Sequence, residues 1–179
     1  MNLGNLSPDT HTAEQVARLL QLEPLDQEGG FFRRTGAGGT MLPGGGRRAW
    51  SMIYVLITPE GFSALHRLAA DELWFFHAGD ALESLRLRPD GGGEWVRLGL
   101  NAAAGERLQD VVPAQVWQGT RLAPGGRWAL VSCVVVPEFV WDDFELGECA
   151  ALCSAWPAFA TGITALTRTA PPAGERRGG

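Results

Sequence analysis

The sequence predicts an all-β protein, a sandwich or barrel of short strands, with one helix near each end. Residues 51–136 form short apolar runs separated by turn residues at near-regular intervals, which is typical of sandwiches and barrels. The length of 179 residues suits one domain with a sizeable core. We therefore expect a flexible N-terminus over residues 1–12, one domain over 13–160 and a disordered tail over 161–179.

The first predicted element is a helix over residues 13–21. Thr12 and Gln15 form a capping-box pattern, an apolar stripe follows, and Pro24 stops the helix. The next segment, 35–48, is rich in glycine and contains a proline. Such a composition is typical of turns and loops, so we expect a mobile surface loop there.

Eight strands are predicted after this loop, each bounded by turn residues. They span residues 51–57, 62–68, 72–77, 82–87, 94–98, 107–112, 116–121 and 128–136. Strand alternation places Ile53 and Tyr54 of the first strand on opposite faces, and the sequence leaves open which face points inward. A short helix over 148–155 is predicted before Pro157.

The composition excludes several classes of function. The formal net charge is -5 and both signs are interspersed, so we expect no nucleic-acid partner. Neither a signal peptide nor a run of about 18 apolar residues is found, and no membrane span is expected. All 15 basic residues are arginine, so no lysine can form a Schiff base. Three cysteines without a Cys-x-x-Cys motif fit a reducing, cytoplasmic location.

The segment 61–79 carries the candidate site. It places His66 and Glu72 on two apolar runs that are separated by a polar turn. If these runs pair as an antiparallel hairpin, both side chains point into one cavity, and Trp74 and Phe76 share the face of Glu72. One imidazole and one carboxylate in such a space can perform acid–base chemistry, help to hold a metal or anchor a polar ligand.

The spacing in this segment resembles the first motif of the cupin superfamily, with Leu68 in place of its second histidine. In the second cupin motif, Gln118 stands where the last histidine is expected. The chain is more specifically similar to the Cupin_5 (DUF985) subfamily over residues 13–157. The segments that carry this resemblance are 28–33, 53–54, 66–67, 71–74, 111–114, 117–118, 128–131 and 137–146.

The resemblance implies a cupin double-stranded β-helix, an RmlC-like jelly-roll barrel, and a homodimer. Leu73 and Phe75 alternate with Glu72 and are expected to face another sheet or a partner subunit. The chain departs from the subfamily at residues 26–27 and at Arg34, in segments expected to cover the barrel mouth. We therefore expect its ligand to differ from the family norm.

Three functions are open for this site, and the first is metal-independent binding of a small polar or aromatic organic molecule in the barrel. Four aromatic side chains are candidates to stack on a flat ring, namely Phe32, Trp74, Phe76 and Trp117. Glu72, Gln118 and Arg33 are candidates to bind its polar edge.

The second function is that of an isomerase, epimerase or lyase acting on a small molecule. At fold level the chain is similar to cupin-barrel sugar-nucleotide epimerases, which use a histidine held by a carboxylate with a tyrosine opposite. By that likeness His66 is the general base, either Glu72 or an acid of the segment 142–145 orients it, and Tyr54 is the single tyrosine available. Whether the protein is an enzyme stays open.

The third function is that of a metal-dependent enzyme with a reduced ligand set, which would consist of His66, Glu72 and Gln118. Leu68 has no donor atom, and the neutral amide of Gln118 is a weak ligand for a divalent transition ion. We therefore expect no metal and no other cofactor.

Overall fold

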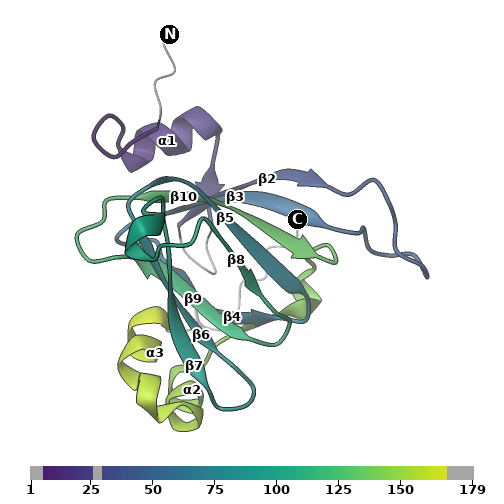
Figure 1. Ribbon diagram of the computed structural model, residues 1–179. Helices are drawn as coiled ribbons and strands as arrows, with labels where there is room; N and C mark the ends of the chain where they lie inside the picture. Colours follow the sequence, from purple (N-terminus) through teal and green to yellow (C-terminus); the bar gives the residue numbers. More distant parts are fainter. Residues whose placement is uncertain (1–5, 26–29, 169–179) are drawn as a thin grey trace.

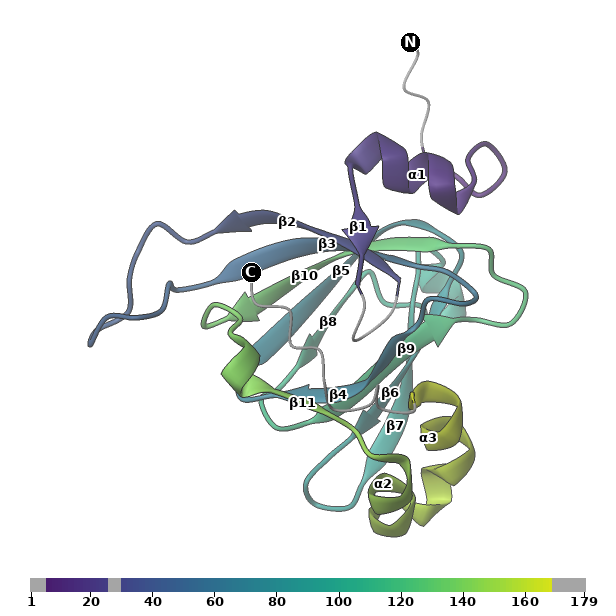
Figure 2. The ribbon, with the colours of Figure 1, turned by 180° about the vertical axis from the view of Figure 1, so that it is seen from behind.

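The computed structural model describes residues 6–25 and 30–168, and two antiparallel sheets face each other in it as a jelly-roll barrel (Figures 1 and 2). The six-stranded sheet has the order β1 (Glu23–Pro24), β2 (Phe31–Ala37), β3 (Ser51–Ile57), β10 (Ala129–Val136), β5 (Asp71–Gly79) and β8 (Gln109–Val112). The five-stranded sheet has the order β11 (Phe144–Leu146), β4 (Ser63–Leu68), β9 (Trp117–Leu122), β6 (Leu82–Leu87) and β7 (Gly93–Leu98).

The predicted all-β class is confirmed. All eight predicted strands are present, and the ends of each differ from the prediction by two residues or fewer. The N-terminal helix, α1 (Ala13–Leu20), has the capping box that its sequence indicates, because Thr12 N donates to Gln15 Oε1 at 2.8 Å and Gln15 N to Thr12 Oγ1 at 3.3 Å. The second helix, α2 (Cys149–Ala155), also lies where it was expected.

Two predicted irregular segments contain regular structure. The segment 35–48 was expected to be a loop, but its first residues belong to β2, which pairs with β3 as a long hairpin (Figure 1). The disordered tail was predicted to start at residue 161, but residues 160–166 form a helix, α3 (Ala160–Leu166). This helix buries Ile163 and Leu166 against the five-stranded sheet. Burial of these two side chains stabilises the helix in a way that the short local pattern did not reveal.

Residues 6–12, expected to be flexible, contact one end of the barrel. Trp128 Nε1 donates to His11 O at 2.8 Å, and Arg127 Nη1 donates to Pro8 O at 3.0 Å. Residues 1–5, 26–29 and 169–179 lie outside the described part of the chain, and with them the start of the segment 28–33 of the family resemblance and most of the predicted tail.

Apolar side chains fill part of the barrel interior. Trp74, Phe76 and Val131 belong to a buried apolar cluster between the two sheets. A second cluster joins the outer face of the five-stranded sheet to α2 and α3, which lie beside β6 and β7 in Figure 1. In the described residues no single helix is long and apolar enough to cross a membrane; α2 and the helical segment 157–166 reach that length only together, with a bend of 120° between them.

Candidate ligand-binding site

The barrel encloses a cavity of about 220 Å³. Inner-face side chains of β3, β5 and β10 form one wall, and β4 and the segment after β10 contribute to the other. The wall is mainly apolar and includes Ile53, Val55, Leu68, Trp74, Val135 and Phe139. Strand alternation explains this set, because every second residue of a strand faces the same side of its sheet.

Two titratable side chains, the imidazole of His66 and the carboxylate of Glu72, line the closed end of this cavity. Both lie on its surface although they are 2% and 6% exposed, and His66 Nε2 is 3.9 Å from Glu72 Oε2. The two strands that carry them do not pair as the predicted antiparallel hairpin, because β4 belongs to the five-stranded sheet and β5 to the six-stranded sheet. The barrel therefore brings an imidazole and a carboxylate together inside an apolar space.

The orientation of the His66 ring is defined by its neighbours. Its Nδ1 lies 2.8 Å from Ala64 O, and its face stacks on Phe144 with a centroid distance of 5.1 Å and an interplanar angle of 24°. A carbonyl oxygen only accepts hydrogen bonds, so Nδ1 carries the proton in the neutral ring. The lone pair is then on Nε2, which faces Glu72.

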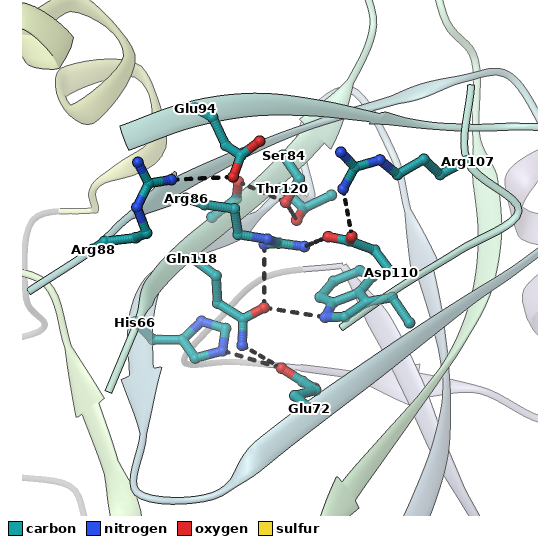
Figure 3. Close-up of polar contacts among 12 residues, drawn as sticks. His66, Glu72, Ser84, Arg86, Arg88, Glu94, Arg107, Asp110, Gln118 and Thr120 are labelled. Atoms are coloured by element: carbon teal, nitrogen blue, oxygen red, sulfur yellow. Dashed lines mark hydrogen bonds and ion pairs between the residues drawn. The ribbon is translucent and has the colours of Figure 1, made fainter. Parts of the chain in front are cut away.

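Gln118 lies next to Glu72 and is hydrogen-bonded to its carboxylate (Figure 3). Gln118 Nε2 donates to Glu72 Oε2, while Gln118 Oε1 accepts from Trp74 Nε1 at 3.1 Å and from Arg86 Nη1 at 3.3 Å. Since both of these partners are donors, the amide oxygen must point to them and the amide nitrogen to Glu72. Gln118 therefore positions the carboxylate, and it does not line the cavity.

A buried ion pair continues this network to the surface. Arg86 Nη2 lies 3.2 Å from Asp110 Oδ2, and Arg107 Nη1 lies 2.8 Å from Asp110 Oδ1 (Figure 3). Burial lowers the pKa of the Arg86 guanidinium, and the charge of Asp110 opposes that shift. The sequence analysis missed Arg86 and Asp110, and the available signal was a polar residue at an inward position of a strand.

The other candidate residues fall into two groups. Phe32 and Trp74 line the cavity, whereas Phe76 points into the barrel but is part of the filled core beyond it. Tyr54, Arg33 and Trp117 face outward, so their predicted positions inside the barrel are wrong. Tyr54 contacts the edge of His77 at 5.8 Å, and Arg67 lies 4.7 Å above the Trp117 ring.

The pairing of β2 with β3 explains two of these corrections. Arg33 is opposite Tyr54 and Arg34 is opposite Ile53. Directly paired residues share a face of the sheet, so the first pair faces outward and the second faces the cavity. Arg34, which the sequence analysis did not include among the binding residues, therefore lines the cavity at its mouth.

The donor atoms at this site do not fit a divalent metal ion. Of the described residues, only His66 and Glu72 bring strong donor atoms together here; Leu68 contributes methyl groups, and Gln118 Oε1 is turned away towards two donors. Among residues 6–25 and 30–168, no group of three or more His, Cys, Asp and Glu side chains is arranged to hold a metal. A transition ion normally takes three or four such ligands from protein.

Comparisons with known proteins agree with this architecture. Residues 14–147 match the sequence profile described as cupin superfamily (DUF985). A Shewanella oneidensis protein is 38% identical, with 89% of this chain and 99% of that chain covered and a TM-score of 0.82. A hypothetical protein from Leishmania major is 33% identical, with 89% and 100% covered and a TM-score of 0.81.

More distant structures share only the fold. An oxalate decarboxylase from Lactobacillus farciminis, described as a formate complex, is 11% identical, with 84% of this chain and 43% of that chain covered and a TM-score of 0.51. No curated protein matches the chain.

Proposed function

The chain belongs to the Cupin_5 family of the cupin superfamily (DUF985), and from its cavity we propose that it binds a small organic molecule inside the barrel without a metal ion. The observation that carries this proposal is the buried pair of His66 and Glu72 at the closed end of an otherwise apolar cavity. A carboxylate beside an imidazole in an apolar cavity gives a polar group of a ligand a place to bind.

The dimensions of the site indicate the size of this ligand. An apolar cavity of about 150 Å³ can hold benzene, so 220 Å³ gives room for one ring with one or two substituents. His66 Nε2 and Glu72 Oε2 are 3.9 Å apart, and both residues line the cavity. A hydroxyl or amino group of the ligand that donates to Glu72 therefore also lies beside the imidazole.

An isomerase-type reaction with His66 as the base has less support. Tyr54, the candidate for the opposite side of the substrate, packs on the outer face of the sheet. In the described part of the chain, no tyrosine and no second histidine lines the cavity. His66 and Glu72 occupy the same end of the cavity, so they favour recognition of one polar group over proton transfer across two faces of a substrate.

The test is calorimetric titration of chelator-dialysed protein with single-ring molecules that carry a hydroxyl or an amino group. We expect one or more of them to bind, and His66→Ala and Glu72→Gln to weaken that binding about tenfold or more, since hydrogen bonds to charged or buried groups contribute about 1.5–3 kcal/mol. Tyr54→Phe is the control on the outer face and keeps the affinity. Undiminished binding by both cavity variants would contradict the proposal.

We also propose that a second copy of the chain covers the outer face of the six-stranded sheet. Met52, Val134, Leu73 and Val111 form one apolar row across β3, β10, β5 and β8. Val111 is 55% exposed and the other three are half-buried, and a contiguous exposed apolar patch marks an interaction surface. Light scattering after gel filtration should give a dimer, and Val111→Glu should give a monomer; a monomeric parent protein would refute this.

A further inference from the structure

Two cysteines lie where α2 and α3 pack against each other (Figure 2). Cys149 and Cys153 are half-buried and four residues apart on α2, so the helical spacing places both side chains on one face. Cys149 Sγ lies 3.8 Å and Cys153 Sγ 3.9 Å from a single atom of α3, Thr164 Oγ1. The two thiols also hydrogen-bond to each other. The fold therefore brings two thiols together close to the surface.

These two thiols have different surroundings. Hydrogen bonds with the hydroxyls of Thr167 and Thr164 lower the pKa of Cys149, against the smaller opposing effects of burial and a neighbouring carboxylate. Burial raises the pKa of Cys153. Cys153 Sγ also lies 3.7 Å from Ala160 O, to which a thiol donates and a thiolate does not. Because the thiolate is the nucleophilic form of cysteine, Cys149 is the better nucleophile and Cys153 remains a thiol.

We propose that Cys149 and Cys153 are oxidised by a hydroperoxide to a reversible disulfide within the chain. The Cys149 thiolate attacks one oxygen of hydrogen peroxide, so that an S–O bond forms, the O–O bond breaks and the departing hydroxide takes up the proton that Cys149 lost. The sulfur is thereby oxidised to a sulfenic acid and the peroxide is reduced. Cys153 then attacks this sulfur, the S–S bond forms, the S–O bond breaks and hydroxide leaves with the Cys153 proton as water. In total, two thiols and one peroxide give one disulfide and two waters.

The place of Cys149 at the start of α2 allows this bond to close. Side chains four residues apart on a regular helix have Cβ atoms about 5–6 Å apart, whereas a disulfide needs about 3.5–4.5 Å. Cys149 is the first residue of α2, where the N–H group makes no hydrogen bond within the helix. This end of the helix therefore moves at the least cost. A bond closed in this way keeps some strain, which makes it easier for a thiol to reduce and so reversible.

The experiment oxidises the reduced protein with hydrogen peroxide, blocks the remaining thiols with N-ethylmaleimide and maps them by mass spectrometry. Cleavage after glutamate and arginine places the pair on the peptide 149–168 and Cys133 on another, because Glu148 lies between them. We expect the parent peptide to be unblocked and lighter by two hydrogens, and a dithiol reductant to restore both thiols. Cys133 is 2% exposed and is the control in the same chain, with oxidation about tenfold slower or more.

Two single variants test the separate roles of the thiols. In Cys153→Ser, a sulfenic acid should accumulate on Cys149 and be trapped by dimedone, because the second thiol is absent. In Cys149→Ser, oxidation of Cys153 should be about tenfold slower or more than oxidation of Cys149 in the parent protein. Equal rates in the two variants would overturn the assigned roles.

The parent protein alone can overturn the inference, whether or not the variants fold. If both thiols of the pair stay free at peroxide concentrations that oxidise a small-molecule thiol, or if the disulfide joins two chains, the proposed reaction is wrong. Oxidation of Cys133 as fast as that of Cys149 has the same meaning. Neither thiol of the pair lines the cavity, so such a failure leaves the proposed function in place.

Discussion

Arg86 provides the sharpest test of the buried network, through a comparison with Arg107. Both arginines contact the carboxylate of Asp110, Arg107 at 2.8 Å and Arg86 at 3.2 Å. Distance alone would make Arg107 the more important partner. Burial reverses that order, because the Arg86 side chain is 5% exposed and the Arg107 side chain is 51% exposed.

The magnitudes follow from this difference. Removing one partner of a buried ion pair costs about 3–5 kcal/mol, because it leaves an uncompensated charge. In Arg86→Met, Asp110 keeps Arg107, so we expect the lower end of that range, about 3 kcal/mol. Gln118 Oε1 also keeps one donor, Trp74 Nε1. In Arg107→Met the lost pair is solvent-screened, and we expect less than about 1 kcal/mol.

Urea denaturation monitored by tryptophan fluorescence measures both free energies of unfolding. For a chain of this length, a loss of 3 kcal/mol lowers the melting temperature by about 6–12 °C, which thermal melts can check independently. Methionine keeps most of the apolar stem of arginine, so the comparison isolates the charged group. Arg107→Met that destabilises as much as Arg86→Met would refute the reasoning that burial, and not distance, decides these contributions.

Three further predictions concern pH, metal binding and backbone shape. Burial lowers the pKa of His77 from 6.5, so the unfolded chain takes up its proton first and the free energy of unfolding falls as the pH drops below that value. Urea denaturation between about pH 5 and 8 gives the slope of the free energy of unfolding against pH, and this slope should be smaller in His77→Gln than in the parent protein. An unchanged slope would contradict the assignment of this pH dependence to His77. The double variant Leu68→His/Gln118→His should bind Co²⁺ or Zn²⁺ in calorimetry, because it supplies the missing donors; stoichiometric binding by the parent protein would show that two donors suffice. Gly79→Ala should lower the melting temperature more than Gly91→Ala, since both have positive φ but of these two only Gly79 would bring the new Cβ against a backbone carbonyl oxygen, that of Trp128. Equal shifts would mean that the close approach relaxes at no cost.

Local patterns were sufficient for most of the strands and for the two side chains at the closed end of the cavity. Turn residues mark strand ends, and alternation decides which residues of one strand share a face. His66 and Glu72 were therefore found from the spacing and alternation of two neighbouring runs, although the hairpin predicted to join these runs does not form. β2 was not found, because Arg33-Arg34-Thr35-Gly36 has no apolar alternation and becomes a strand through its pairing with β3.

The sequence by itself determined the strand pattern, the family resemblance and the alternation along each strand that places His66 and Glu72 on inward faces. Only the tertiary structure decided that Arg34 and Ile53 face the cavity while Arg33 and Tyr54 face away, because one strand does not show which of its faces another sheet will cover. Only the pairing of β9 with β6 brings Arg86 to Gln118. Such contacts join residues far apart in the chain, and their free energy depends on burial that no local pattern records.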